Sequence, residues 1–413
     1  MKNMNIVSKI TLIALGTTLL LSNCRKGCTD PEANNYDEKA KKNDESCTYD
    51  EDESYAVPSV YIFTDAAGNN TVSFSGQYAR LDMLSEMATY LKTSNTAGTS
   101  VSLTTLQAMY ANNAHTWIDA NSLGMTGSSK QLKNKTAYSS ADGSPDAGIQ
   151  IWIEDYMDSL ASLSALTVTG AESGTSGTAG VWPNDGTKGP YLMSANGVEY
   201  MQIIEKTLMS AVFSSQITVN YLGTLSDDDN EIVTDAGASK YYTEMEHHWD
   251  EAYGYFTTEV TYPTLGTDRF WGKYADGREG ILSSATIISE AFRKGRAAIS
   301  NADYTERDAQ IVIIRTELEK VQAGTAIHYL NEAKSNISAN TTRNHVLSEA
   351  YAFVNGIRFG YNSINGQSIT AAEIDQVLGF LGNDFNNITV ADINNAIDLL
   401  ALKINLTSVK DNL

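Results

Sequence analysis

The spacing of the apolar residues constrains the fold of this chain more than any other feature of its sequence. From Gly76 onward, apolar residues recur at steps of three and four, as Leu81, Leu84 and Leu91 illustrate, which places them on one face of an α-helix. The same pattern covers residues 102–112, 147–164, 196–217, 238–258, 280–300, 304–337, 342–362, 371–382 and 390–404. The sequence therefore predicts a mainly α protein with a large helical-bundle domain.

Two local signals refine this prediction. The run Thr370-Ala-Ala-Glu373 has the capping-box pattern and marks the start of the penultimate helix. Ahead of the helical region, residues 55–63 and 71–75 are rich in β-forming side chains and flank a turn at Gly68-Asn69-Asn70. This arrangement predicts a small N-terminal β-hairpin.

Three long loops separate the predicted helices. The loop at 124–144 carries the only basic cluster of the domain, formed by Lys130, Lys133 and Lys135. The loop at 170–190 is rich in Gly, Ser and Thr, and either covers a site or is a disordered insertion. An acidic loop follows at 226–237, but it lacks the glycine and the final glutamate that a calcium EF-hand requires.

The N-terminal residues have the pattern of an exported lipoprotein. Lys2 and Lys9 precede an apolar run at 10–21, which has the length of a signal-peptide core and is too short to span a bilayer. The run ends in Leu-Ser-Asn-Cys24, which resembles a bacterial lipobox. We expect residues 1–23 to be a signal peptide and Cys24 to carry lipid, which anchors the chain to the cell envelope at its periplasmic face or at the cell surface.

The remaining cysteines fit an exported protein. With Cys24 acylated, Cys28 and Cys47 form an even pair in a compartment where disulfides persist. Residues 24–53 are polar and acidic, and we expect a disulfide-stapled spacer, with calcium binding as the alternative. The folded domain then covers 54–413. No cysteine follows Cys47, so the domain has no thiol nucleophile, iron–sulfur cluster or cysteine zinc site.

The charge of the chain restricts its partners. It has 29 basic and 50 acidic residues among 413, a formal net charge of −21. This surplus repels phosphate backbones, so we expect no nucleic-acid partner. It is compatible with the attraction of cations, although acidity also serves solubility alone.

One predicted helix carries residues that suit a metal ion. Glu244, His248 and Glu251 are spaced by four and three residues and lie along one helix face, where His247 adds a second imidazole. Imidazole with carboxylate suits iron, zinc or manganese. The alternative is that the two histidines are structural, one buried against Trp249 and one at the surface.

Other residues and reaction classes are less well supported. His328 and Glu332 form another pair at a spacing of four, which would complete a shell if their helix packs beside the first. A second Glu-x-x-His pair, as a di-iron bundle needs, is absent from the sequence. So are the zinc-protease, nucleophile-elbow, P-loop and dinucleotide motifs, and we predict no catalytic residue.

Two family resemblances bear on function. The run Glu246-His-His-Trp-Asp-Glu251 resembles the Gly-x-His-x-x-Glu motif of imelysin-type (peptidase M75-like) lipoproteins, with His248 and Glu251 matched and Glu246 at the glycine position. Most of the chain is similar to a lipoprotein family named domain of unknown function 4856. That resemblance rests on Tyr61-Ile-Phe63 with Val72-Ser-Phe-Ser-Gly76, on Ser129-Lys-Gln-Leu-Lys133, and on His247-His-Trp-Asp-Glu-Ala-Tyr-Gly-Tyr255.

The imelysin resemblance implies an all-helical domain of two bundle-like halves and an association with iron uptake. We therefore expect an envelope-anchored, non-enzymatic protein that binds iron, zinc or an iron-bearing ligand, with envelope iron-uptake proteins as partners. The expected ligands are His248 and Glu251, assisted by Glu244 or His247. The alternatives are a metal-dependent hydrolase and an adhesive or assembly module without metal.

Overall fold

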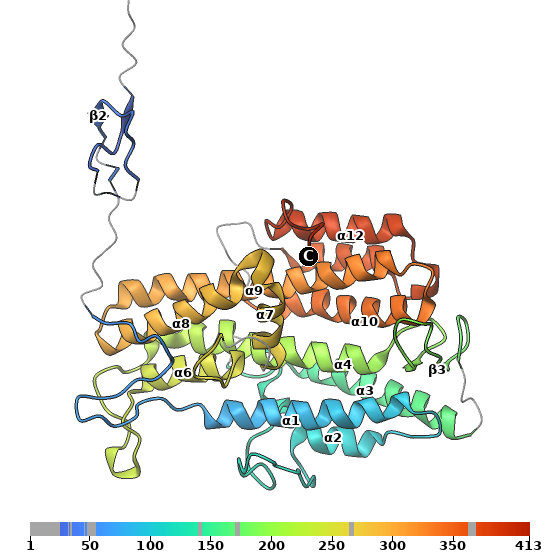
Figure 1. Cartoon of the computed structure of the whole chain (residues 1–413). Coiled ribbons are helices and arrows are strands. Elements are labelled where there is room, and N and C mark those ends of the chain that lie inside the picture. The colour runs from blue at the N-terminus through green and yellow to red at the C-terminus, as the bar shows by residue number, and fades with distance from the viewer. Residues whose placement is uncertain are drawn as a thin grey trace, which may run out of the picture. The chain divides into compact units, whose positions relative to one another are not determined.

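The computed structural model in Figure 1 describes residues 25–31, 33, 35–44, 46–47, 55–138, 143–169, 174–263, 268–361 and 369–413. The predicted signal peptide and Cys24 lie outside these residues. The chain divides into two compact units, Met1–Ala56 and Val57–Leu413.

The first unit is small and is cross-linked by a disulfide between Cys28 and Cys47. Its strands β1 (Lys26–Gly27) and β2 (Lys42–Asn43) pair in parallel. Closing a loop of this size lowers the entropy of the unfolded chain and contributes about 3 kcal/mol. The disulfide therefore compensates for a segment that has almost no apolar core.

The second unit is mainly helical, which confirms the predicted fold class. Its α-helices are α1 (Ser75–Lys92), α2 (Leu103–Ala111), α3 (Ala147–Val168), α4 (Tyr200–Leu208), α5 (Leu222–Thr224), α6 (Glu244–Phe256), α7 (Phe270–Leu282), α8 (Ser284–Ser300), α9 (Tyr304–Ser335), α10 (Asn340–Gly356), α11 (Ala371–Leu381) and α12 (Val390–Lys403). The 3-10 turns are η1 (Thr93–Asn95), η2 (Lys133–Lys135), η5 (Leu225–Asp227), η6 (Ala236–Ala238), η7 (Ile357–Phe359) and η8 (Phe385–Asn387). The capping box that the sequence predicts at Thr370 and Glu373 opens α11.

The longest helix, α9, organises the packing of this unit. Its 32 residues pack along α7, α8, α10 and α12 (Figure 1). Helix α10 in turn packs on α4, and α4 is covered by α1 and α3. Helix α6 packs against α1 and α8. Burial of the apolar stripes between these layers is the main source of stability, at about 25 cal/mol per Å² of apolar surface.

Helix α7 is the largest element that the apolar pattern does not predict. It contains Gly272, Gly277 and Gly280, and glycine lowers helix propensity by about 1 kcal/mol per residue. Tertiary packing overrides this tendency because Phe270, Trp271 and Ala275 are buried against the neighbouring helices.

A π-helical region follows α4. The segments η3 (Met209–Ser214) and η4 (Gln216–Tyr221) continue α4 with the wider π turn, and almost all of their side chains are buried. Such segments interrupt α-helices rarely and are frequent at functional sites. Here η4 packs against α6 and carries Tyr221 to it.

The predicted N-terminal hairpin is present as a short antiparallel pairing, with a bridge between Thr64 and Asn70 and a hydrogen bond from the N–H of Thr71 to the carbonyl of Phe63 at 3.0 Å. The described part of the Gly-rich loop contains strand β3 (Gly180–Trp182), which pairs antiparallel with strand β4 (Tyr191–Met193) directly after the loop. From this loop, Asp185 accepts a hydrogen bond from the backbone N–H of Thr342 in α10 at 2.8 Å. Within the described residues, no helix combines the length and the apolar character needed to cross a membrane.

Candidate functional site

Helix α6 carries the His/Glu residues that the sequence singles out. Thr243 opens it with a capping box, because its hydroxyl accepts from the N–H of Glu246 while the Glu246 carboxylate accepts from the N–H of Thr243. Residues four apart share a face, so Glu246 and Asp250 lie on one side, and His247 and Glu251 on another. These two faces have different roles.

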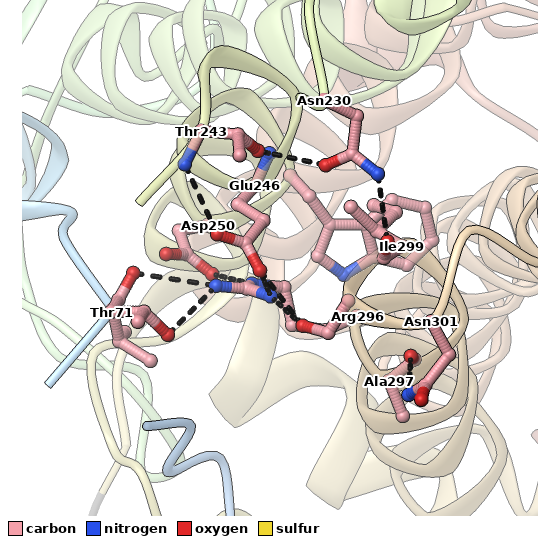
Figure 2. A network of polar contacts seen from close by, with 12 residues as sticks. Thr71, Asn230, Thr243, Glu246, Asp250, Arg296, Ala297, Ile299 and Asn301 are labelled. Carbon is pink, nitrogen blue, oxygen red and sulfur yellow. Dashed lines mark hydrogen bonds and ion pairs between the residues drawn. The ribbon is translucent and has the colours of Figure 1, made fainter. Parts of the chain in front are cut away.

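The first face enters a buried ion network around Arg296 of α8, shown in Figure 2. The Arg296 Nε lies 3.0 Å from Asp250 Oδ1, and its Nη1 lies 2.6 Å from Glu246 Oε1. Arg296 and Asp250 are 0% exposed. Asp250 belongs to the motif at 247–255 and Glu246 directly precedes it, and both carboxylates pair with Arg296 in the protein interior.

The Arg296 guanidinium is fully satisfied. Its remaining donors reach Ser300 Oγ at 2.6 Å and both the hydroxyl and the carbonyl of Thr71, at 3.1 and 3.3 Å. A guanidinium has five N–H groups, and five acceptors surround this one. Asp250 also accepts from the Tyr61 hydroxyl at 2.8 Å. The network therefore fastens the segment before α1 to α6 and α8.

Asn230 extends this network to the acidic loop, as Figure 2 also shows. Its side chain donates to the carbonyl of Ile299 and accepts from the Thr243 hydroxyl, both at 2.8 Å. The loop is thereby fixed at the start of α6. In this position of the loop, the Asp228 carboxylate lies 2.7 Å from Nδ1 of His248.

On the second face, His247 directs its Nε2 toward Glu251. Its Nδ1 lies 3.0 Å from the carbonyl oxygen of Ser73, which can only accept, so Nδ1 carries the proton. Burial lowers the pKa of His247, although the Glu251 carboxylate opposes this, and the neutral ring predominates at neutral pH. The lone pair on Nε2 then faces Glu251, with Oε1 3.9 Å away.

Glu251 is held in position by hydrogen bonds that involve Gln77 and Tyr221. Its Oε1 accepts from Gln77 Nε2 at 2.7 Å, and the same nitrogen lies 3.4 Å from the Tyr221 hydroxyl. An imidazole and a carboxylate that are each held by an outer hydrogen bond have the arrangement of metal ligands in proteins. The donor set of His247 and Glu251 thus fits a transition-metal ion.

The other expected ligands are placed differently. His248 turns to Asp228, and although burial disfavours its charge, this carboxylate raises its pKa. Glu244 is exposed, and its Oε2 accepts from the N–H of Asp229 at 3.4 Å. The close pair is therefore His247 with Glu251, whereas the His-x-x-Glu resemblance singles out His248 with Glu251. Because both pairs have a spacing that places them on one helix face, the sequence alone does not show which histidine lies closer to Glu251.

His328 and Glu332 lie elsewhere in the fold. Helix α9 meets α6 near its start, where Arg307 Nη1 lies 3.3 Å from the sulfur of Met245. His328 is 21 residues further along α9, about 30 Å at 1.5 Å per residue. Glu332 pairs with Lys188 at 2.5 Å. These two residues do not join the α6 site.

The three motifs of the family resemblance meet at the α6 site. Ser73 from the first contacts His247 of the third, while Arg80 of α1 donates to the carbonyls of Gly76, in the first, and Gln131, in the second. Lys135, which closes the basic cluster, lies 3.5 Å from the Tyr221 hydroxyl. In the part of the chain that the structure describes, no group of three or more His, Cys, Asp or Glu side chains is arranged to hold a metal.

A second buried polar cluster links α4, α10 and the residue before α4. His345 of α10 lies between two carboxylates, with Glu199 Oε2 2.6 Å from Nδ1 and Glu349 Oε2 3.6 Å from Nε2. Burial disfavours the charged ring, but Glu199 and then Glu349 outweigh it and raise the pKa of His345, against an opposing effect of Lys188.

This cluster predicts a pH dependence of stability. Because the pKa of His345 is raised on folding, its contribution is fully present below about pH 6.5 and is lost as pH rises through the folded-state value. The loss in free energy of unfolding caused by His345→Gln should therefore be larger at pH 6 than at pH 9, measured by urea denaturation. His115→Gln is the control, because burial lowers the pKa of His115 and gives the opposite trend. Parallel trends in both variants would contradict the prediction.

The fold and the site define a helical-bundle domain that presents one neutral imidazole and one carboxylate at a half-exposed edge. The chain belongs to the family described as Domain of unknown function (DUF4856), whose family model matches residues 58–407. No curated protein and no solved structure matches it.

Proposed function

We propose that this protein is a lipid-anchored binding protein of the bacterial cell envelope, without enzymatic activity, whose ligand is a transition-metal ion, iron in the first place, or a complex that contains one. Its role would be in metal uptake. The observation that carries the proposal is the His247 and Glu251 pair, in which the Nε2 lone pair faces a carboxylate 3.9 Å away.

Two further observations support this proposal. A hydrogen bond to another residue orients each member of the pair: His247 donates to the Ser73 carbonyl, and Glu251 accepts from Gln77. Such hydrogen bonds to neighbouring groups are typical of metal ligands. The acidic chain, with its net charge of −21, also favours the approach of cations. The lipid anchor rests on the sequence pattern that ends at Cys24.

The test is metal content and affinity of the full-length chain, purified without a histidine tag or chelator. We expect near-stoichiometric iron or zinc in the native protein and its loss in His247→Ala and Glu251→Ala. Gln77→Ala should weaken binding by about 10- to 100-fold, as outer-contact variants do.

His328→Ala is the matched control, because His328 lies far from α6, and its metal content should equal that of the native chain. No metal in the native protein after incubation with ferrous iron, with zinc and with a chelated ferric ion would overturn the proposal. Hydrolysis of a peptide substrate that is lost in Glu251→Gln would show a metal-dependent hydrolase instead.

A further inference from the structure

Two cations, Lys135 and Arg80, lie on the Tyr221 side of the His247 and Glu251 pair, whereas the carboxylates of Asp228 and Glu244 lie on the His248 side. Lys135 Nζ contacts the Tyr221 hydroxyl at 3.5 Å and lies 5.7 Å from the centre of its ring. Arg80, only 8% exposed, donates to two backbone carbonyls. Both cations thus contact uncharged acceptors, in a chain that has a large surplus of carboxylates.

Burial and then Arg80 lower the pKa of Lys135, and the Glu251 carboxylate opposes them. On the Tyr221 side of the site, the Glu251 carboxylate thus faces two cations. Partly buried charge is poorly screened by solvent, so an uncompensated cation is costly and favours an anionic partner.

Gln77 adds an open acceptor at the same place. Its Nε2 is used by Glu251 and Tyr221, but its Oε1 is buried and has no hydrogen-bond partner within the described residues. A buried acceptor that makes no hydrogen bond costs about 1–3 kcal/mol, so such groups usually accept one from a ligand or from water. Among the described residues, the side chain that orients Glu251 thus has one acceptor that is available to a ligand or to water.

The coordination number of the metal also favours an ion that is already bound to another ligand. His247 and Glu251 supply two ligands, and an octahedral ion has four further positions. A chelating ligand that fills those four positions would leave two neighbouring positions open for the pair.

We propose that the ligand of this site is a metal ion already held by an anionic, oxygen-donor chelator, and that Lys135, with Arg80 behind it, recognises the anionic part. This inference rests on the proposed function. In this proposal, His247 and Glu251 bind the metal and Lys135 contacts the negative charge of the chelator. Gln77 accepts a hydrogen bond from a hydroxyl or water of the complex.

The test compares Co²⁺ alone, Co²⁺–nitrilotriacetate (net charge −1, two open positions) and Co²⁺–iminodiacetate (neutral, three open positions) by calorimetry on the tag-free full-length chain. We expect the anionic complex to bind more tightly than the neutral one. Lys135→Met should weaken binding of the anionic complex by about 10- to 100-fold and leave bare Co²⁺ binding within about twofold, as one charge-assisted contact predicts.

Lys130→Met is the matched control, because Lys130 belongs to the same basic cluster but donates to the carbonyl of Leu123. It should behave as the native chain does. If all three probes bind and Lys135→Met changes none of them selectively, the chelate inference is overturned while the metal site stands. If none binds, the proposed function and the inference both fall.

Discussion

Replacing Arg296 with methionine should lower the free energy of unfolding by about 3–5 kcal/mol, the cost of removing one partner from a buried ion network. The reason is that Glu246 and Asp250 would remain buried without their cation. Burial already raises the pKa of Asp250 to about 6, so the carboxyl is charged at pH 7 only against a desolvation penalty. Urea denaturation at pH 7 measures the effect.

Lys294→Met in the same helix is the control. Lys294 pairs with Glu290 at 3.3 Å, but both side chains are substantially exposed, so the loss should be below about 1 kcal/mol. The triple variant that adds Glu246→Gln and Asp250→Asn should recover part of the stability lost in Arg296→Met. An Arg296→Met loss no larger than that of Lys294→Met would contradict the structural role of the network.

The second large effect concerns Gly295, also in α8. A Cβ at this position would lie 2.2 Å from Cη2 and Cζ2 of Trp249, a ring that is fully buried. Gly295→Ala should therefore destabilise the protein by about 1–3 kcal/mol through overpacking, despite the better helix propensity of alanine. Because Trp249 belongs to α6, the strain acts on the helix that carries the site.

Gly277→Ala in α7 provides the comparison, since a Cβ there meets nothing within 4 Å. This change should stabilise the protein by up to about 1 kcal/mol, the propensity difference between glycine and alanine. Thermal or urea unfolding of both variants measures the contrast. Equal changes in the free energy of unfolding for the two variants would mean that Gly295 does not contact Trp249 as closely as the structure shows.

The sequence allowed most of the helical framework to be predicted, because each helix has its own apolar stripe. The predicted ranges for α2, α9 and α12 differ from the structure by at most two residues at either end. The least accurate start is that of α6, where the acidic loop continues to Tyr242. There the Asn230 contacts hold the chain in a loop conformation, and a periodicity count does not include such contacts.

The candidate site was only partly predictable. The sequence marked His247, His248 and Glu251, because imidazoles and carboxylates at helical spacing are visible in a linear motif. It did not mark Gln77 or Tyr221, which come from α1 and η4 and have no local signature, and it marked Lys135 only as part of the basic cluster and not as part of this site. Their role depends on contacts between residues 86 to 174 positions apart in the chain.

By itself, the sequence determined the mainly helical fold, the opening of α11 at Thr370 and the presence of a His/Glu helix, since these depend on the order of neighbouring residues. Only the tertiary structure decided that Glu246 and Asp250 are buried against Arg296 while His247 and Glu251 remain partly exposed. All four residues have the same helical spacing. Which pair becomes structural depends on the side of α6 against which α8 packs, and that choice is made by long-range burial and charge pairing.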